Sequence, residues 1–242
     1  MALNEETITI DKASALTGYL ARPSDAAPRP PVLVIYEIFG LTNNIRNAAA
    51  RLADAGYVAL APDFFRHDPV PYNQFAEARR VSSSLSDAGA MSDIAASIDY
   101  LQSQPYVRTG PSAVLGFCMG GRIAFLAACK LNTRIGACVD FYGARLSGGR
   151  VHEGQTMVPL DEAASLRCPV QLFFGDQDSF IPPEEVEIIR DRLDDLGASF
   201  EIELYPDAGH GFCCEERDSY HPAAAADAWA RALQFLEATI RA

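Results

Sequence analysis

The segment Gly116-Phe-Cys-Met-Gly-Gly121 constrains this chain more than any other part of its sequence. It follows the apolar run Ala113–Phe117, which is typical of a buried strand, and it precedes a stretch with helical spacing. A G-x-S-x-G nucleophile elbow requires this strand–turn–helix context, and Cys118 stands here in the place of serine. The turn needs small residues two positions before and after its centre, and Gly116 and Gly120 provide them. The sequence therefore predicts a thiol presented at the junction of a strand and a helix.

Short apolar runs alternate with segments of helical spacing along most of the chain, and this alternation predicts an α/β fold. Continuous apolar runs are typical of strands covered on both faces of a parallel sheet, whereas Phe200–Leu204 alternates strictly and is expected near a sheet edge. The expected strands are Pro31–Tyr36, Val58–Ala61, Ala113–Phe117, Ala137–Phe141, Val170–Phe174 and Phe200–Leu204. The expected helices are Asn44–Ala55, Ala90–Gln102, one from about Gly120, Val186–Leu196 and Ala226–Ile240, the last with Trp229 toward the core. We therefore expect a three-layer α/β-hydrolase fold with a mainly parallel sheet, in which ligands bind at the carboxyl ends of the strands.

Length, composition and charge limit the class of protein. A chain of 242 residues with 49% hydrophobic residues predicts a single domain that spans residues 1–242. The formal net charge of −12, without any local run of Lys or Arg, argues against a nucleic-acid partner. The sequence has neither the pattern of a secretion signal nor an apolar run long enough to span a bilayer, so we expect a cytoplasmic protein without a membrane partner. Most of the six cysteines are expected to be reduced, and their spacing offers at most one local zinc cluster, Cys213 and Cys214 after His210, without a second pair of ligands.

Two acids follow the expected strand Val170–Phe174, in the loop Gly175–Pro182. This loop leaves the carboxyl end of its strand and so opens on the same edge of the sheet as Cys118. Asp178, which lies deeper in the loop, is the candidate to orient a histidine, and Asp176 is expected to stabilise the turn. The alternative is that both acids only cap the helix that follows.

One histidine stands out among the four of the chain, which are His67, His152, His210 and His221. A lone loop histidine is more often structural or solvated, but His210 alone follows a strand end between two glycines, where backbone can approach a substrate. The order Cys118, Asp178, His210 is the nucleophile–acid–histidine order of α/β-hydrolases. We therefore predict that these three side chains act together.

The segment Tyr36–Gly40 follows an early core strand and supplies the last expected part of the site. A hydrolase elbow needs two main-chain donors for an oxyanion, and the expected donors are the amides of Ile38 and Met119. Glu37 is then expected near the thiol. Most glutamates are solvated surface residues. Glu37 leaves an apolar strand at the rim of the expected site, and this position favours a functional role.

These residues together resemble the dienelactone hydrolases, from about Glu5 to the last helix. The motifs that carry the resemblance are Glu37-Ile-Phe-Gly, Gly116-Phe-Cys-Met-Gly-Gly, the Asp178 loop that ends at Pro182, and Ala-Gly-His210. The resemblance implies Cys118 as nucleophile, His210 as base, Asp178 as orienting acid, and Glu37 as a partner that switches the cysteine between resting and reactive positions. It also implies that Tyr142 lines the substrate pocket.

The chain departs from the best-known family member at positions that hold a substrate carboxylate. That protein uses two arginines, one on the helix preceding the elbow and one four residues after the catalytic histidine. Here the second position is Cys214, and Arg79 and Arg80 are only nearby candidates for the first. Gly211 also replaces a serine of that protein. The departures put activity on dienelactone itself in doubt.

A cysteine nucleophile restricts the substrate by the basicity of its leaving group. A thiol has a free pKa of about 8.5, well below that of an alkanol, so a simple alkyl ester would mostly expel the cysteine again. We expect a small-molecule enol lactone, activated aryl ester or thioester as substrate, with no metal or organic cofactor.

A thioesterase or general carboxylesterase is the alternative enzyme. A thiol redox or binding module that uses Cys213 and Cys214, or a Cys118 that is only a small buried hydrophobe, is less favoured.

Overall fold

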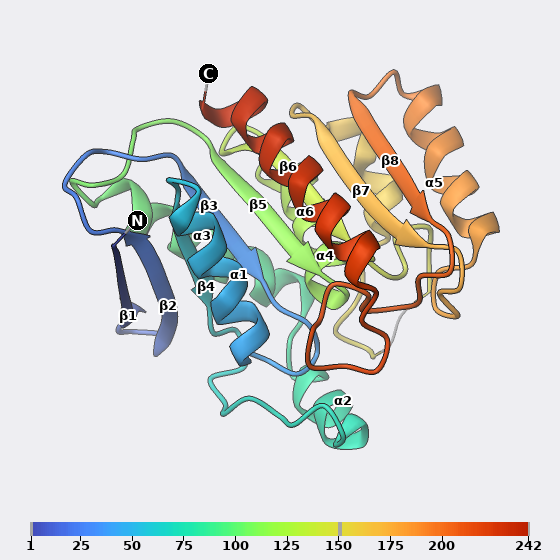
Figure 1. The fold of residues 1–242 in the computed structure, drawn as a ribbon, viewed down its shortest axis with the longest axis horizontal. Coiled ribbons are helices and arrows are strands. Elements are labelled where there is room, and N and C mark those ends of the chain that lie inside the picture. The colour runs from blue at the N-terminus through green and yellow to red at the C-terminus, as the bar shows by residue number, and fades with distance from the viewer. Residues whose placement is uncertain (1, 150–151, 242) are drawn as a thin grey trace.

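The computed structural model describes residues 2–149 and 152–241, which are built around one eight-stranded sheet (Figure 1). The strand order is β1-β2-β4-β3-β5-β6-β7-β8. Strands β3 to β8 run parallel to one another, and β2 runs antiparallel to both of its neighbours. The strands are β1 Leu3–Asp11, β2 Leu16–Pro23, β3 Pro31–Ile35, β4 Val58–Pro62, β5 Ser112–Phe117, β6 Ile135–Phe141, β7 Val170–Gly175 and β8 Phe200–Tyr205.

All six strands expected from the sequence are present, and β8 lies at the sheet edge as its alternating pattern predicts. Strands β1 and β2 were not expected. β1 reads Leu-Asn-Glu-Glu-Thr-Ile-Thr-Ile-Asp and has several exposed positions, so it lacks the continuous apolar run that marks the buried strands. The sheet is therefore mixed at one edge and parallel where the candidate residues lie.

Helices cover both faces of the sheet, as predicted. They are α1 Asn43–Asp54, α2 Phe75–Ser82, α3 Asp87–Gln102, α4 Met119–Lys130, α5 Pro183–Asp195 and α6 Pro222–Leu236, with short helical turns η1 Pro159–Ser165 and η2 Glu237–Arg241. In Figure 1, α1 and α6 cross the face of the sheet that is turned toward the viewer. None of the helices in the described residues is both long and apolar enough to cross a membrane.

Helix α4 is the most deeply buried helix: all of its residues except Lys130 are buried, and most of them are apolar or small on every side of the helix. It lies against β5 and β6 on one face of the sheet. On the other face, Phe141 of β6 stacks on Phe117 of β5 and contacts Trp229 of α6. Trp229 is 6% exposed, which confirms its predicted place in the core.

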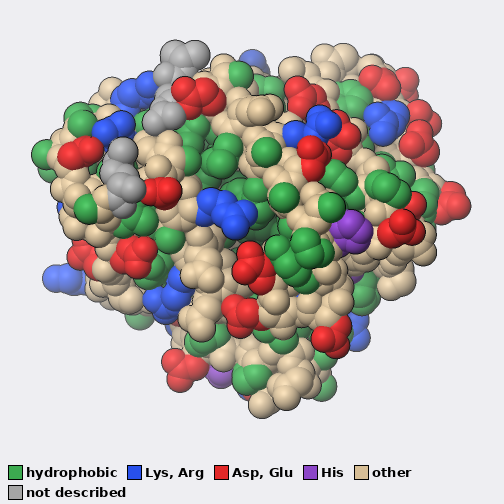
Figure 2. All heavy atoms as spheres, in the orientation of Figure 1, with side chains coloured by type: hydrophobic (Ala, Val, Ile, Leu, Met, Phe, Trp, Pro, Cys, Tyr) green, Lys and Arg blue, Asp and Glu red, His purple; other side chains and the backbone are tan. Residues whose placement is uncertain are grey.

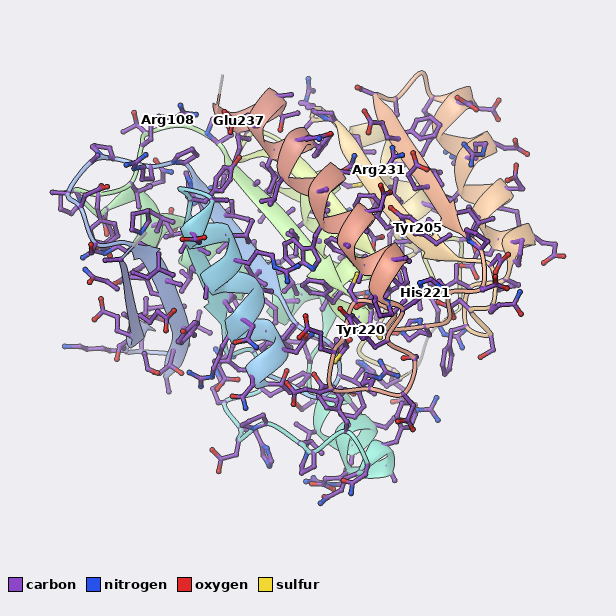
Figure 3. All side chains as sticks on the ribbon, viewed as in Figure 1. Arg108, Tyr205, Tyr220, His221, Arg231 and Glu237 are labelled. Atoms are coloured by element: carbon purple, nitrogen blue, oxygen red, sulfur yellow. The ribbon has the colours of Figure 1, made fainter. Side chains whose placement is uncertain are left out.

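The outer side of α6 is held by polar contacts with β8 (Figure 3). Arg231 donates to Glu203 at 2.8 Å, and the hydroxyl of Tyr205 donates to Asp227 at 2.9 Å. At the start of the helix, His221 accepts a hydrogen bond from the amide of Ala224 and caps the first turn. These contacts fix the helix that follows the His210 loop.

Candidate active site

Cys118 occupies a left-handed backbone position between β5 and α4, with φ of +55°. A side chain at this φ is strained, so the surrounding contacts must impose it. The amide of Cys118 donates to Phe141 at 2.9 Å, and its carbonyl accepts from Gly121 at 3.0 Å. A Cβ atom on Gly116 would collide with the backbone of Gly120, which shows why the sequence has glycine there. The turn therefore has the backbone form predicted for an elbow.

The imidazole of His210 joins Cys118 to Asp178. Its Nε2 lies 3.0 Å from Cys118 Sγ, and its Nδ1 lies 2.7 Å from Asp178 Oδ2. The other carboxylate oxygen of Asp178 accepts from the amide of Phe180 at 2.8 Å, so the carboxylate is held in the loop after β7. Nδ1 must donate to the carboxylate, which leaves Nε2 for the sulfur.

The two acids of the loop after β7 have different partners. Asp178 is buried and faces His210, whereas Asp176 accepts a hydrogen bond from the amide of Asp207 at 2.8 Å and stabilises the adjoining turn. Cys118, Asp178 and His210 come from the ends of β5, β7 and β8, three strands of the parallel part of the sheet. The sheet thus brings together residues that are up to 92 positions apart in the chain.

The charge distribution around the imidazole favours its protonated form. Burial is the largest single influence and lowers the pKa of His210, but the sulfur of Cys118 and the carboxylate of Asp178 raise it by more, to about 10. An imidazolium 3.0 Å from the sulfur stabilises a thiolate. The protonated imidazole thus places a positive charge beside the sulfur.

Two aromatic rings enclose His210. The ring of Phe180 lies 5.0 Å from the imidazole and that of Tyr142 lies 5.3 Å away, both edge-on. Tyr142 is fully buried, and its hydroxyl has no hydrogen-bond partner among the described residues. Tyr142 therefore lies behind the histidine, and the structure does not place it among the pocket-lining residues where the resemblance put it.

Ile38 and Met119 both line the pocket beside Cys118. Within the described part of the chain, neither amide donates to a main-chain acceptor outside its own helix or strand. Met119 is the first residue of α4, where helical amides have no intrahelical acceptor. Both amides are therefore available to a developing oxyanion.

Glu37 is a buried carboxylate beside the site. It is 1% exposed, and neither of its oxygens has a hydrogen-bond partner among the described residues. Burial raises the pKa of Glu37, although the charges of Arg217 and His210 oppose that rise. Arg217 Nη1 lies 3.7 Å from its carboxylate, whereas Cys118 Sγ faces His210. The structure thus shows the sulfur turned toward the imidazole rather than bonded to Glu37.

A cavity that opens to solvent is lined by both the sulfur and the imidazole. It is lined by Ile38, Phe39, Phe75, Arg79, Ser82, Cys118, Met119, Arg122, Ala144, Arg145, His152, Gln155, Phe180, His210 and Arg217. None of these residues is an acid, although acidic side chains are spread over the visible face of the molecule (Figure 2). The cavity combines apolar walls with guanidinium groups.

The structure separates the two arginines proposed from the sequence. Arg79 lines the cavity and lies over the ring of Phe75, whereas Arg80 is paired with Glu77 and is absent from the cavity wall. Sequence reasoning did not identify Arg122, Arg145, His152 or Arg217 as lining residues. Arg217 follows His210 by only seven positions, so its closeness in the chain was the available signal.

A buried ion pair holds one wall of the cavity. Arg122 of α4 donates to both carboxylate oxygens of Asp87 at 2.6 and 3.2 Å, and both side chains are 2% exposed. Arg122 also donates to the carbonyl of Met157, whose amide donates to Asp87. The pair therefore anchors residues near 157; of the segment 145–159, residues 150 and 151 lie outside the described residues.

The other cysteines offer little support for thiol exchange. All six cysteines are free, and Cys213 and Cys214 are 5% and 0% exposed. Burial raises the pKa of Cys214 to about 11 and that of Cys213 well above its ordinary value. Among the described residues, no group of three or more His, Cys, Asp or Glu could hold a metal ion.

An elbow with a cysteine at its centre, followed in the chain by an acid and a histidine that lie beyond neighbouring strand ends, is the arrangement of an α/β-hydrolase. The model of the dienelactone hydrolase family matches residues 16–240. The chain therefore belongs to the dienelactone hydrolase family and is a hydrolase of carboxylic esters or lactones.

Similar proteins cover nearly the whole chain. A protein of Escherichia coli (strain K12) named "Putative carboxymethylenebutenolidase" is 37% identical over 92% of this chain and 82% of its own length. A "Probable 2-oxo-3-(5-oxofuran-2-ylidene)propanoate lactonase" of Bradyrhizobium sp. is 33% identical over 96% of this chain and 95% of its own length. A crystal structure described as a "Putative Dienelactone Hydrolase" of Klebsiella pneumoniae superposes with a TM-score of 0.90 at 32% identity, over 97% of this chain and 98% of that one.

Proposed function

We propose that this protein opens enol lactones, or cleaves similarly activated esters, through a thioester on Cys118. The observation that carries the proposal is a pair of contacts made by the His210 imidazole. Its Nε2 lies 3.0 Å from the sulfur of Cys118 in the strained elbow, and its Nδ1 lies 2.7 Å from the Asp178 carboxylate. In a nucleophile–base–acid arrangement, the base lies within hydrogen-bonding distance of the nucleophile, and a third group orients the base. Both conditions are met by Cys118, His210 and Asp178.

The reaction has two halves. The Cys118 thiolate attacks the lactone carbonyl, and the resulting oxyanion accepts hydrogen bonds from the amides of Ile38 and Met119. The carbon–oxygen bond of the ring then breaks, and the imidazolium of His210 gives its proton to the leaving enolate oxygen. In the second half, His210 takes a proton from water, and the hydroxide attacks the thioester. The carbon–sulfur bond then breaks, the thiolate returns, and the product leaves as a carboxylic acid that loses its proton to solvent.

The leaving group explains why an enol lactone suits this nucleophile. The tetrahedral intermediate expels the less basic group, and a thiolate is less basic than an alkoxide. An enolate is stabilised by conjugation and competes with the thiolate far better than an alkoxide does. A cysteine at the elbow therefore favours enol lactones, aryl esters and thioesters over simple alkyl esters.

The cavity also favours an anionic substrate with a flat apolar body. Arg79 and Arg145 line it without an acidic partner among the described residues, while Phe39, Phe75 and Phe180 provide apolar surface. Guanidinium groups bind carboxylates in bidentate form. The compound in the Bradyrhizobium relative's name has this chemistry, because it bears a propanoate beside a furanone ring. We propose a lactone with a free carboxylate as the substrate class, and neither a metal nor an organic cofactor.

Replacement of the sulfur tests the mechanism. Cys118→Ala should abolish hydrolysis of a carboxylate-bearing enol lactone, and Cys118→Ser should shift the preference toward simple alkyl or aryl esters. Cys129→Ala, which changes a buried cysteine of α4 that does not line the cavity, is the matched control and should retain activity. Mass spectrometry of the quenched reaction should find the acyl group on Cys118. Hydrolysis by Cys118→Ala at the parental rate would show that another group is the nucleophile.

A thioesterase or general carboxylesterase on the same scaffold is the alternative, because the two contacts of His210 serve any acyl transfer. A panel of enol lactones with and without a carboxylate, acyl thioesters and aryl esters separates these activities by kcat/KM. The cationic cavity favours the carboxylate-bearing lactone. Faster turnover of a neutral thioester would replace the lactone proposal with the thioesterase.

A further inference from the structure

A fully buried acid lies beside the candidate active site without a role in the proposed reaction. Asp140 is the sixth residue of β6, a strand that is otherwise apolar or small, and it is 0% exposed. Its register partners are Gly116 on β5 and Leu172 on β7, so it lies in the middle of the parallel sheet. An acid is costly at such a position unless its contacts compensate the loss of water. Its partners are therefore informative.

The side chain of Asp140 points to the α4 face of the sheet. The next residue, Phe141, packs against Trp229 of α6 on the opposite face, as strand alternation requires. A Cβ atom on Gly121, in the first turn of α4, would collide with the Asp140 carboxylate, and so would one on Gly143. The carboxyl group thus fills the space that these two glycines leave between the elbow helix and the end of β6.

One oxygen of Asp140 closes the turn that follows β6. Oδ1 accepts a hydrogen bond from the amide of Gly143 at 2.7 Å, and Oδ2 has no partner among the described residues. Tyr142 lies between Asp140 and Gly143 in the chain. Its φ of +45° is strained for an aromatic residue, and its amide donates to the carbonyl of Phe173 at 2.8 Å. This turn carries the tyrosine ring that lies edge-on against His210 at 5.3 Å.

We propose that Asp140 is a positioning residue for His210: its carboxyl closes the Asp140–Gly143 turn against α4, and the turn holds the Tyr142 ring against the imidazole. The inference rests on the proposed role of His210 and goes beyond it, because Asp140 contacts neither the sulfur nor the cavity. A residue with this role acts on the rate of the chemical step rather than on substrate binding, since it changes the placement of the base.

The protonation state of Asp140 fits this role. Burial raises the pKa of Asp140 to about 8, although the Gly143 amide and the charge of His210 act to lower it. The group is therefore mainly a neutral acid at pH 7. Asp140 interacts electrostatically with His210 and with the buried Cys138. His210 also interacts with Cys118, Asp178 and Glu37. An asparagine reproduces the neutral form, including an oxygen that can accept from Gly143.

The proposal is tested with three variants. Asp140→Ala removes the acceptor, and it should lower kcat by about 10- to 100-fold with KM within about twofold, since a small displacement of a catalytic group has effects of this size. Asp140→Asn keeps the acceptor and should restore kcat to within about threefold of the parent at pH 7. Cys138→Ala, two residues earlier on the same face of β6, is the packing control and should retain the parental kcat.

Two further measurements separate this inference from the proposed function. The rate of Cys118 alkylation by iodoacetamide at pH 6 reports the thiolate–imidazolium pair without any substrate, and it should fall in Asp140→Ala but not in Cys138→Ala. The parental pH–rate profile should contain an ionisation near pH 8 that Asp140→Asn lacks. Equal kcat in Asp140→Ala and Cys138→Ala, or an equal loss in Asp140→Ala and Asp140→Asn, would overturn the assignment. Failure of every lactone with normal alkylation behaviour would instead refute only the proposed substrate.

Discussion

The ion pair between Asp87 and Arg122 makes the strongest prediction for stability, because both side chains are 2% exposed. Asp87→Asn keeps the size and an acceptor oxygen but removes the negative charge, which leaves the Arg122 guanidinium buried without a counter-ion. Loss of one partner of a buried pair costs about 3–5 kcal/mol of unfolding free energy. With an m-value of about 3 kcal/mol/M, the urea midpoint should fall by about 1–1.7 M. The fluorescence of Trp229, the sole tryptophan, reports the transition.

A second pair on the same helix is the matched control. Asp99 of α3 pairs with Arg134 at 2.5 Å, but its side chain is 74% exposed. An exposed pair contributes about 0–1 kcal/mol, so Asp99→Asn should leave the urea midpoint nearly unchanged. Replacement of both buried partners, as in Asp87→Leu with Arg122→Met, should recover much of the lost stability because no charge is left unpaired. Similar midpoints for Asp87→Asn and Asp99→Asn would refute the reasoning.

The same pair has a defined pH dependence. Burial, the largest single influence, raises the pKa of Asp87, but the hydrogen bonds and charge of Arg122 and the Met157 amide lower it by more, so the net pKa lies below the ordinary value. The stability that the ionised group contributes is therefore present above about pH 4 and is lost as the pH falls through the folded-state pKa. The difference between the parent and Asp87→Asn should shrink correspondingly in acid.

The remaining predictions concern the proposed mechanism. Asp178→Asn should lower kcat by about 10³- to 10⁴-fold, because an amide at this position no longer holds the imidazole in the required tautomer; Asp176→Asn, which alters the other acid of the same loop, should change kcat by less than about threefold, and equal losses would refute the assignment. Arg79→Ala should raise KM for a carboxylate-bearing lactone by about 10- to 100-fold, the equivalent of one charged hydrogen bond, and leave a neutral lactone unaffected. Arg80→Ala should affect neither substrate, because Arg80 lies outside the cavity and is paired with Glu77.

The elbow could be predicted from the sequence because its constraints are local. Gly116, Cys118 and Gly120 lie within five residues, and a strand and a helix flank them on either side. Asp178 and His210 could be predicted for a related reason, since each follows the end of a core strand and the carboxyl ends of parallel strands share one edge. Strand ends thus locate a site even when their order in the sheet is unknown.

Side-chain direction in the loops was harder to predict. Tyr142 directly follows the end of β6, and so lies even closer to its strand than Asp178 does to β7, but its positive φ turns the ring into the core behind His210. The partners Asp87 and Arg122 are 35 residues apart, and neither lies in a motif that indicates the other. Such contacts depend on how α3 packs against α4. The apolar periodicity of each helix shows which face is buried, but not which residues of the two helices lie opposite one another.

The loop after β8 places a cation in the cavity wall although Cys214 stands four residues after His210. Arg217 lines the cavity three residues further along the chain, where its amide donates to the Cys214 carbonyl at 3.2 Å. Gly211 has a φ of +83°, and a Cβ atom there would collide with the guanidinium of Arg217. Gly211 therefore leaves the room that the Arg217 guanidinium occupies. A serine at position 211 would displace the guanidinium, so the charge of this cavity wall depends on both positions together.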